Sequence, residues 1–409
     1  MKIKANVIWK IYYLIIFTTE LISFEFIGNL RLYYIVSLFY FFPFIRQGKK
    51  LVKNKVTNSL FLFISVLLFI SLFSSSIGGS LSGVISLSLN IITAFVTYFV
   101  LCNKKLSLND LFNTLEKIML FCMIFGLITW VLSKFGINIT LNKINSFQIL
   151  NDQIAAFRTE ANTHGKLCCY AVAYCIPFLT FKKMNRRRWF ITITAIATLL
   201  ISPTRSATYA VILATGIFFA ILIKRGKGNR IIKIFALAIV MIAAVPILMQ
   251  SGLISTTGYS FSKLNNFFVT FSEAKNDYSG SFRIESLYAA IDIWTSNLKT
   301  IIMGVGYNQA KVSLQGGKVD TVAAGTQIVG LLVSGGVLSI FAWISVIITT
   351  AKKVVRVSAN DNPITYAMLV CFFYIIIIEF ISADFFVPET WITFGVIAFL
   401  QGGDYFYEN

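Results

Sequence analysis

The chain has 409 residues, of which 57% are hydrophobic and only 13% are charged. Since soluble domains carry about 25% charged residues, this composition excludes an ordinary soluble enzyme and indicates a membrane protein. The formal net charge of +19 does not indicate nucleic-acid binding, because the basic residues lie in loops between apolar runs, where they serve topology and meet lipid headgroups.

The apolar runs are roughly 15 to 24 residues long, which favours membrane helices over the shorter alternating strands of a barrel. We therefore predict an all-α, polytopic membrane helix bundle of about 12 transmembrane helices, with residues 1–409 forming a single integral membrane domain. The first run begins at Val7 without a small-residue cleavage site, which predicts an uncleaved span. The predicted spans are residues 7–28, 30–45, 59–77, 83–102, 114–135, 163–181, 189–202, 206–223, 231–250, 326–350, 364–383 and 387–401.

Lysines and arginines concentrate in every second loop, which predicts that both termini are cytoplasmic. The basic segments on the predicted cytoplasmic side are residues 2–10, 46–55, 104–117, 182–188, 224–233 and 352–356. Two long segments, 136–162 and 251–325, then lie outside.

The second external segment contains apolar residues at helical spacing from Ser281 to Thr300, including Trp294, before Gly304 and Gly306 interrupt the pattern. This predicts an amphipathic helix on the outer membrane–water boundary, where tryptophan is a favoured residue.

Arg205 lies in a short turn between two predicted spans, at the outer boundary. An arginine there is suited to gripping phosphate through its fixed fork of donors, although it could equally extend to lipid headgroups. Arg283 opens the predicted amphipathic helix, where it could bind a ligand or pair with Glu285 and Asp292 on a solvated face.

Arg158, Glu160 and His164 precede or begin the sixth predicted span. Glu160 is a candidate general base or a solvated acid, and His164, the only histidine, is a candidate base or a structural residue. We expect neither a zinc site nor a disulfide framework nor a cofactor, because the six cysteines lie in or beside apolar runs without a Cys-x-x-Cys pair.

Acidic residues inside the predicted spans are functional candidates, since charges at membrane depth are costly, and they could equally hydrogen-bond within the bundle. They are Glu20, Glu25, Glu379 and Asp384.

Several of these features together resemble the O-antigen polymerase and O-antigen ligase superfamily of bacterial envelope enzymes. The features are the number of spans with one long late external loop; the turn 202–206 followed by a span; Arg283 followed by a helix and then Gly304-Val305-Gly306-Tyr307; and the segment 323–336 entering the next span. The resemblance covers roughly residues 158–350.

The resemblance implies a metal-independent glycosyltransferase of the bacterial cytoplasmic (inner) membrane. Such a polymerase moves a growing glycan, for lipopolysaccharide O-antigen or a similar polysaccharide, from undecaprenyl diphosphate to the non-reducing end of a new lipid-linked unit. Arg158, Arg205 and Arg283 would bind the diphosphate, and Glu160 or His164 would take the proton of the acceptor hydroxyl. The expected partners are the lipid-linked oligosaccharide, membrane lipids and a chain-length regulator, and no nucleic acid.

The ligases of this superfamily carry a histidine just before the late span, where this chain has Gly325, and an acid that Ser334 replaces. This departure favours a polymerase over a ligase, which stays an alternative. A lipid-linked sugar flippase or secondary transporter is a further alternative, in which Glu20 and Glu379 would relay protons.

Overall fold

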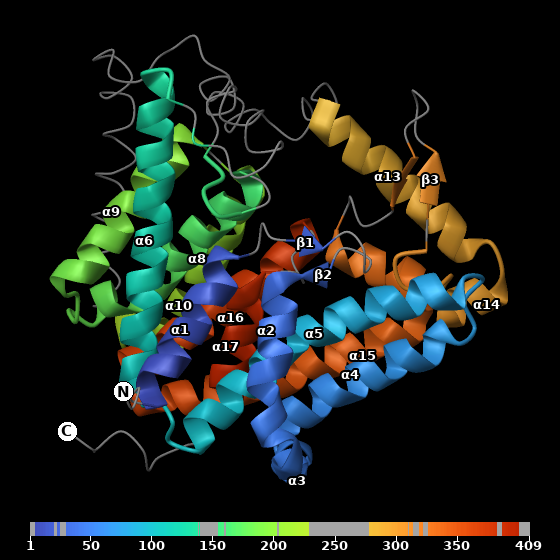
Figure 1. Cartoon of the computed structure of the whole chain (residues 1–409), viewed down its shortest axis with the longest axis horizontal. Helices are drawn as coiled ribbons and strands as arrows, with labels where there is room; N and C mark the ends of the chain where they lie inside the picture. Colours follow the sequence, from blue (N-terminus) through green and yellow to red (C-terminus); the bar gives the residue numbers. More distant parts are fainter. Residues whose placement is uncertain are drawn as a thin grey trace.

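A computed structural model describes residues 5–19, 23–24, 30–137, 139, 154–158, 161–202, 204–228, 278–309, 311–313, 319–321, 326–382 and 387–400. The predicted all-helical fold is confirmed, since β structure in these residues is confined to two short antiparallel pairs (Figure 1). The α-helices are α1 (Ala5–Thr18), α2 (Leu32–Phe41), α3 (Gly48–Lys53), α4 (Lys55–Ser71), α5 (Ile77–Cys102), α6 (Leu108–Lys134), α8 (Ala161–Thr180), α9 (Arg186–Ile201), α10 (Arg205–Lys224), α13 (Tyr278–Thr295), α14 (Leu298–Met303), α15 (Gln327–Val357), α16 (Pro363–Ile381) and α17 (Pro388–Phe399). The remaining elements are the 3-10 helices η2 (Phe42–Gln47) and η6 (Ser358–Asn360) and the strands β1 (Ser23–Phe24), β2 (Leu30–Arg31), β3 (Lys311–Ser313) and β4 (Val319–Thr321).

Among the described residues, 5 helices are long and apolar enough to cross a membrane: α5, α6, α10, α15 with η6, and α16. Every predicted span overlaps a helix except 231–250, which lies outside the described residues. The count of twelve membrane crossings and the orientation stay predictions.

The first two predicted spans are shorter than expected. α1 ends at Thr18, where Thr18 and Thr19 turn their hydroxyls back onto backbone carbonyls, and β1 then pairs with β2. α2 gives way to the 3-10 helix η2, which contains Pro43. At 1.5 Å per residue, α1 and α2 are only about 21 and 15 Å long, less than the roughly 30 Å of a bilayer core.

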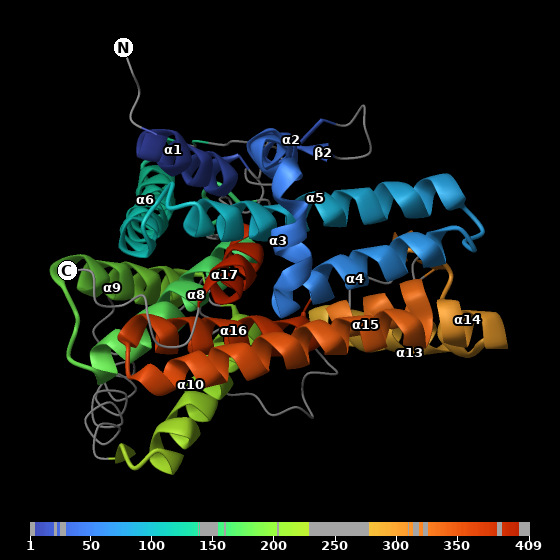
Figure 2. The same ribbon diagram turned by 90° about the horizontal axis from the view of Figure 1, so that it is seen from below.

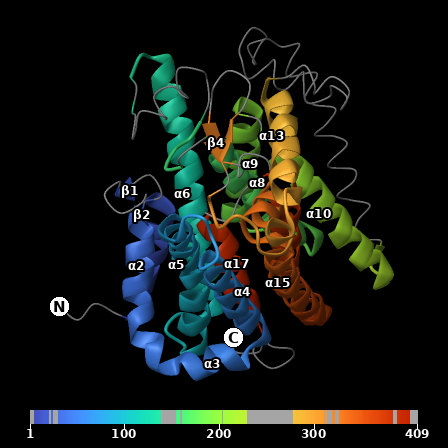
Figure 3. The ribbon, with the colours of Figure 1, turned by 90° about the vertical axis from the view of Figure 1, so that its right-hand side faces the viewer.

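Helix ends next to the basic segments of the predicted cytoplasmic side contact one another. Arg225, after α10, donates hydrogen bonds to the carbonyls of Val355 and Ser358 at the end of α15. Arg188, in α9, donates to the carboxylate of Glu116 near the start of α6. Figure 3 shows many helices running in similar directions, with α3 towards one end and α13 towards the other.

The helix α17 lies in the core of the bundle, because it is buried from Pro388 to Ala398. It packs on α5, where a Cβ on Gly395 would come within 2.5 Å of the Ala94 carbonyl oxygen, so only glycine permits this approach. Figure 2 shows α17 near the centre of the molecule. The position of α17 places its first turn inside the protein.

The predicted amphipathic helix 281–300 is interrupted. α13 ends at Thr295, and Asn297 caps a new helix, α14, by a reciprocal pair of hydrogen bonds with Thr300. α14 ends as predicted at Gly304, whose φ of +68° suits glycine. Tyr288 is 66% exposed and Leu298 is 72% exposed, so α13 and α14 present apolar side chains outward.

Candidate functional site

A short segment before α8, residues 154–158, enters the helix bundle. Ile154 and Ala155 are buried, and Gly126 of α6 permits the approach, since a Cβ there would lie 2.8 Å from the Ile154 side chain. Gly126 lies eight residues from the end of α6 at Lys134, a distance of about 12 Å along the helix. The segment therefore carries Arg158 below the surface of the bundle.

Arg158 forms a buried ion pair with Glu389 in the first turn of α17. The distance between Nη2 and Oε2 is 3.0 Å, and the two side chains are 1% and 4% exposed. The guanidinium also lies over the ring of Phe17, at 5.4 Å from its centroid. Arg158 is thus a desolvated cation that a carboxylate holds in place.

His164 lies in the first turn of α8 and is fully buried. Neither ring nitrogen has a hydrogen-bond partner among the described residues. The Nε2 atom would be 2.9 Å from a Cβ on Gly126, so His164 borders the buried segment that carries Arg158. A neutral imidazole donates a hydrogen bond from one ring nitrogen and accepts one at the other, and neither capacity of His164 is used within the described part of the chain.

The starts of α8 and α10 meet beside His164. A Cβ on Gly165 would collide with the Thr204 hydroxyl, so the two helices can touch at this point only because residue 165 is glycine. The hydroxyl of Thr204 is buried and has no hydrogen-bond partner within the described part of the chain. Arg205 follows as the first residue of α10 and is half-buried. Two helix N-termini, each with partial positive charge, therefore converge with an arginine, an arrangement that favours an anion.

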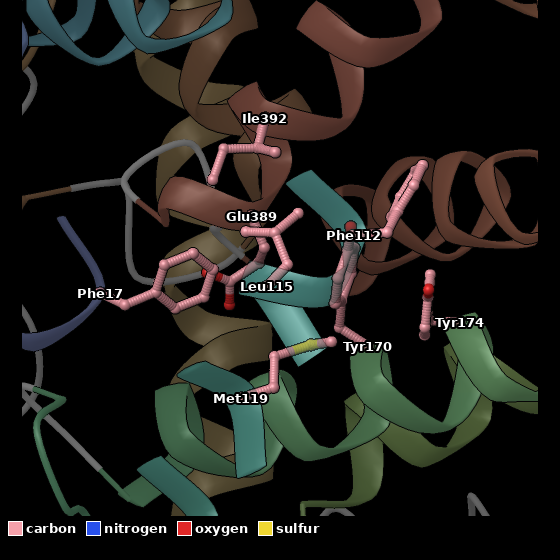
Figure 4. A pocket seen from close by; sticks show the side chains of 8 residues that line it. All are labelled: Phe17, Phe112, Leu115, Met119, Tyr170, Tyr174, Glu389 and Ile392. Atoms are coloured by element: carbon pink, nitrogen blue, oxygen red, sulfur yellow. The ribbon is translucent and has the colours of Figure 1, made fainter. Parts of the chain in front are cut away.

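We call His164, Thr204 and Arg205 the polar cluster. Hydroxyl groups on α8 and α17 extend it into the bundle. Tyr170 of α8 is 2.8 Å from the Thr393 hydroxyl, and Thr393 donates to the Glu389 carbonyl at 2.7 Å. Beside them is a cavity of about 10 Å³, room for about one water molecule. Figure 4 shows the Glu389 carboxylate at this cavity, near Phe17 and Leu115.

Three of the five predicted site residues lie on neighbouring segments. His164 borders the segment that carries Arg158, and Gly165 beside it lies against Thr204, the residue before Arg205. Glu160 lies outside the described residues. Arg283 belongs to α13, which packs on α14 and α15, and the position of its side chain is not described. In Figure 1, α13 and α9 lie on opposite sides of the molecule.

Glu389 is the member of the site that sequence reasoning missed. It was not among the acids singled out from the sequence, and it directly follows Pro388 at the start of the predicted span 387–401, a position typical of a helix N-terminus. A usable signal is that the run 387–401 is short for a complete crossing, which indicates a buried core helix. Of the acids singled out from the sequence, Glu379 is buried in α16, while Glu20, Glu25 and Asp384 lie outside the described residues.

Comparison with known proteins adds no family assignment. No protein-family model matches the chain, and no curated protein matches it.

Proposed function

We propose that this protein polymerises lipid-linked oligosaccharide repeat units at the outer face of a bacterial cytoplasmic membrane. In this proposal it is a metal-independent glycosyltransferase that moves the growing glycan from a polyprenyl diphosphate to the non-reducing end of a new lipid-linked unit. The observation that supports it best is the meeting of the starts of α8 and α10, which gathers Arg205, His164 and the Thr204 hydroxyl.

The donor of such a reaction leaves as a diphosphate, whose negative charge grows in the transition state. Arg205 and the positive ends of α8 and α10 would stabilise that charge without a metal ion. The acceptor hydroxyl must lose a proton as it attacks the anomeric carbon, and His164, beside the start of α10, is the proposed base. Glu160 remains the second candidate for that role.

Water must be excluded from this site, because it would otherwise hydrolyse the donor. His164 and Thr204 are already buried, and the cavity beside Glu389 has room for about one water molecule. Arg158 is proposed to bind the diphosphate as well, held in position by its ion pair with Glu389. Arg283 stays a proposed diphosphate ligand, and this role requires α13 to approach the starts of α8 and α10 from its position on α14 and α15.

The proposal requires that the N-terminal ends of α8 and α10 face the outer side of the membrane. The contacts among the basic helix ends support this orientation, since Arg225 at the other end of α10 joins the end of α15. We expect reporter domains fused after Lys227 and after Lys318 to report opposite sides of the membrane. Signals from the same side would contradict the topology.

A lipid-linked sugar flippase or transporter is the second candidate. The observation that favours it is the burial of the Arg158–Glu389 pair together with buried Glu379, because transporters place charged pairs within the membrane. A carrier that alternates between two states would have to break and remake this pair in each cycle.

The test is Arg205→Ala in cells that depend on this protein for chain growth. We expect single repeat units on the surface acceptor, with the variant still inserted in the membrane, while Arg46→Ala, an exposed arginine in η2, leaves polymer length unchanged. Polymer of normal length in the Arg205 variant would refute the site. Repeat units trapped inside the cell would instead favour the flippase.

A further inference from the structure

A groove of about 780 Å³ lies between the start of α4 and the end of α15. We call it the basic groove, and its cationic side chains are Lys53, Lys55, Lys352, Lys353 and Arg356. The groove is remote from the polar cluster. Arg225 joins the end of α10 to the end of α15, beside the groove. The polar cluster lies at the start of α10, about 30 Å away along that helix.

The positive charge of the basic groove is not neutralised by acidic residues in its lining. No acidic side chain lines it among the described residues. On α15, Lys352 and Arg356 are four residues apart on one helix face, a spacing at which like charges repel. An anion in the groove would relieve this repulsion, and the volume lies in the range of small-molecule sites.

The base of the groove is held rigidly across three helices. Asn54 donates to the Ala398 carbonyl at 2.6 Å, and the Lys353 ammonium donates to the same oxygen. Asn54 also caps α4, so that the positive end of this helix borders the groove. The cations are therefore arranged on a fixed frame instead of being scattered over a surface.

An apolar stripe leads along α15 to the basic groove. Phe341 is 66% exposed, Ile344 is 40% exposed and Ile348 is 46% exposed, and Ile348 itself lines the groove. These residues are three and four positions apart, so they share one face of the helix, and Lys352 continues the same face. An apolar stripe that ends in a cluster of cations matches a molecule with hydrocarbon chains and an anionic head.

We propose that the basic groove binds the phosphate headgroup of an anionic phospholipid, with the acyl chains along the exposed stripe of α15. In the predicted orientation this site lies at the cytoplasmic face, where basic pockets between helices meet anionic lipids. The site is independent of the glycan chemistry proposed above.

The test measures retention of phosphatidylglycerol or cardiolipin by the full chain in phosphatidylcholine nanodiscs. We compare the triple variant Lys53→Gln, Lys352→Gln, Arg356→Gln with a matched triple, Lys49→Gln, Lys105→Gln, Lys183→Gln, whose residues are exposed in basic segments outside the groove. Three cations that contact the bound headgroup predict an affinity on the order of 100-fold lower for the groove variant. The control residues do not line the groove, so a lipid held there should lose less than about twofold in affinity. A charge-conserving variant, Lys53→Arg with Lys352→Arg, should keep the lipid.

Equal losses in the two triple variants would overturn the proposal, since they would show general attraction between basic loops and headgroups. Failure of the wild-type protein to prefer anionic lipid over phosphatidylcholine would overturn it without any variant. Inorganic pyrophosphate is the soluble probe: if it binds the groove while the wild-type protein retains no anionic lipid, the ligand is a free phosphate anion and the lipid assignment is wrong.

Discussion

Removing one partner of the buried Arg158–Glu389 pair is expected to destabilise the protein strongly. Glu389→Gln keeps the size of the side chain but leaves the guanidinium without its carboxylate in a place where the two side chains are 1% and 4% exposed. Breaking a buried pair from one side costs about 3–5 kcal/mol, because the remaining charge stays desolvated. Exposed pairs contribute about 1 kcal/mol or less.

Asp361→Asn is the matched control, because Asp361 pairs with Lys227 at positions that are 43% and 23% exposed. Asp361 has a φ of +56°, a conformation that asparagine also tolerates, so the control changes charge and little else. The assay is the free energy of unfolding in mixed micelles, measured for both variants. A double-mutant cycle of Arg158→Met, Glu389→Leu and the two combined then gives the coupling energy of the pair. A cost for Glu389→Gln no larger than that of Asp361→Asn would refute the reasoning.

Further predictions concern glycines at close contacts, and thermal unfolding in detergent is the measurement for each. Gly165→Ala would force its new methyl group against Thr204 and is expected to cost about 1–3 kcal/mol and to reduce chain growth, because it separates α8 from α10. Gly216→Ala in α10 meets open space and is expected to be neutral or to stabilise by up to about 1 kcal/mol, so equal effects of the two substitutions would contradict the packing. Gly336→Ala is expected to cost about 1–3 kcal/mol, since Gly336 has a φ of +60° inside α15 and lies against the backbone of Ile302; an unchanged melting temperature would rule this out.

The helices could be predicted from the sequence because a run of apolar residues is a local signal. Helix boundaries depend on a second local signal, the capping residues. One such signal contradicts the predicted continuous helix 281–300. Asn297 followed three residues later by Thr300 is a capping pattern, which explains why the helix from Ser281 does not continue. The apolar spacing continues from α13 into α14, so this spacing alone does not indicate that the helix stops between them.

The site was predicted only in part, because its members are distant in the sequence. Arg205 and His164 could be singled out from their places at span boundaries, but their proximity depends on Gly165, whose role is visible only when α8 and α10 are packed together. Glu389 is paired with a residue 231 positions away, and no local pattern identifies such a partner. The identity of the partner of a buried charge was therefore the feature that could not be predicted from the sequence.

The two ends of the bundle use positive charge in different ways. In the basic groove, where Lys53, Lys352 and Arg356 are exposed, water screens each charge, so several cations are needed to hold one anion. At the start of α10 one half-buried arginine acts beside two helix ends, in a drier environment where each interaction is stronger. A lipid site can tolerate weak, additive attraction, whereas a reacting diphosphate needs few donors at fixed positions. This contrast is the physical reason for assigning lipid binding to the groove and chemistry to the meeting of α8 and α10.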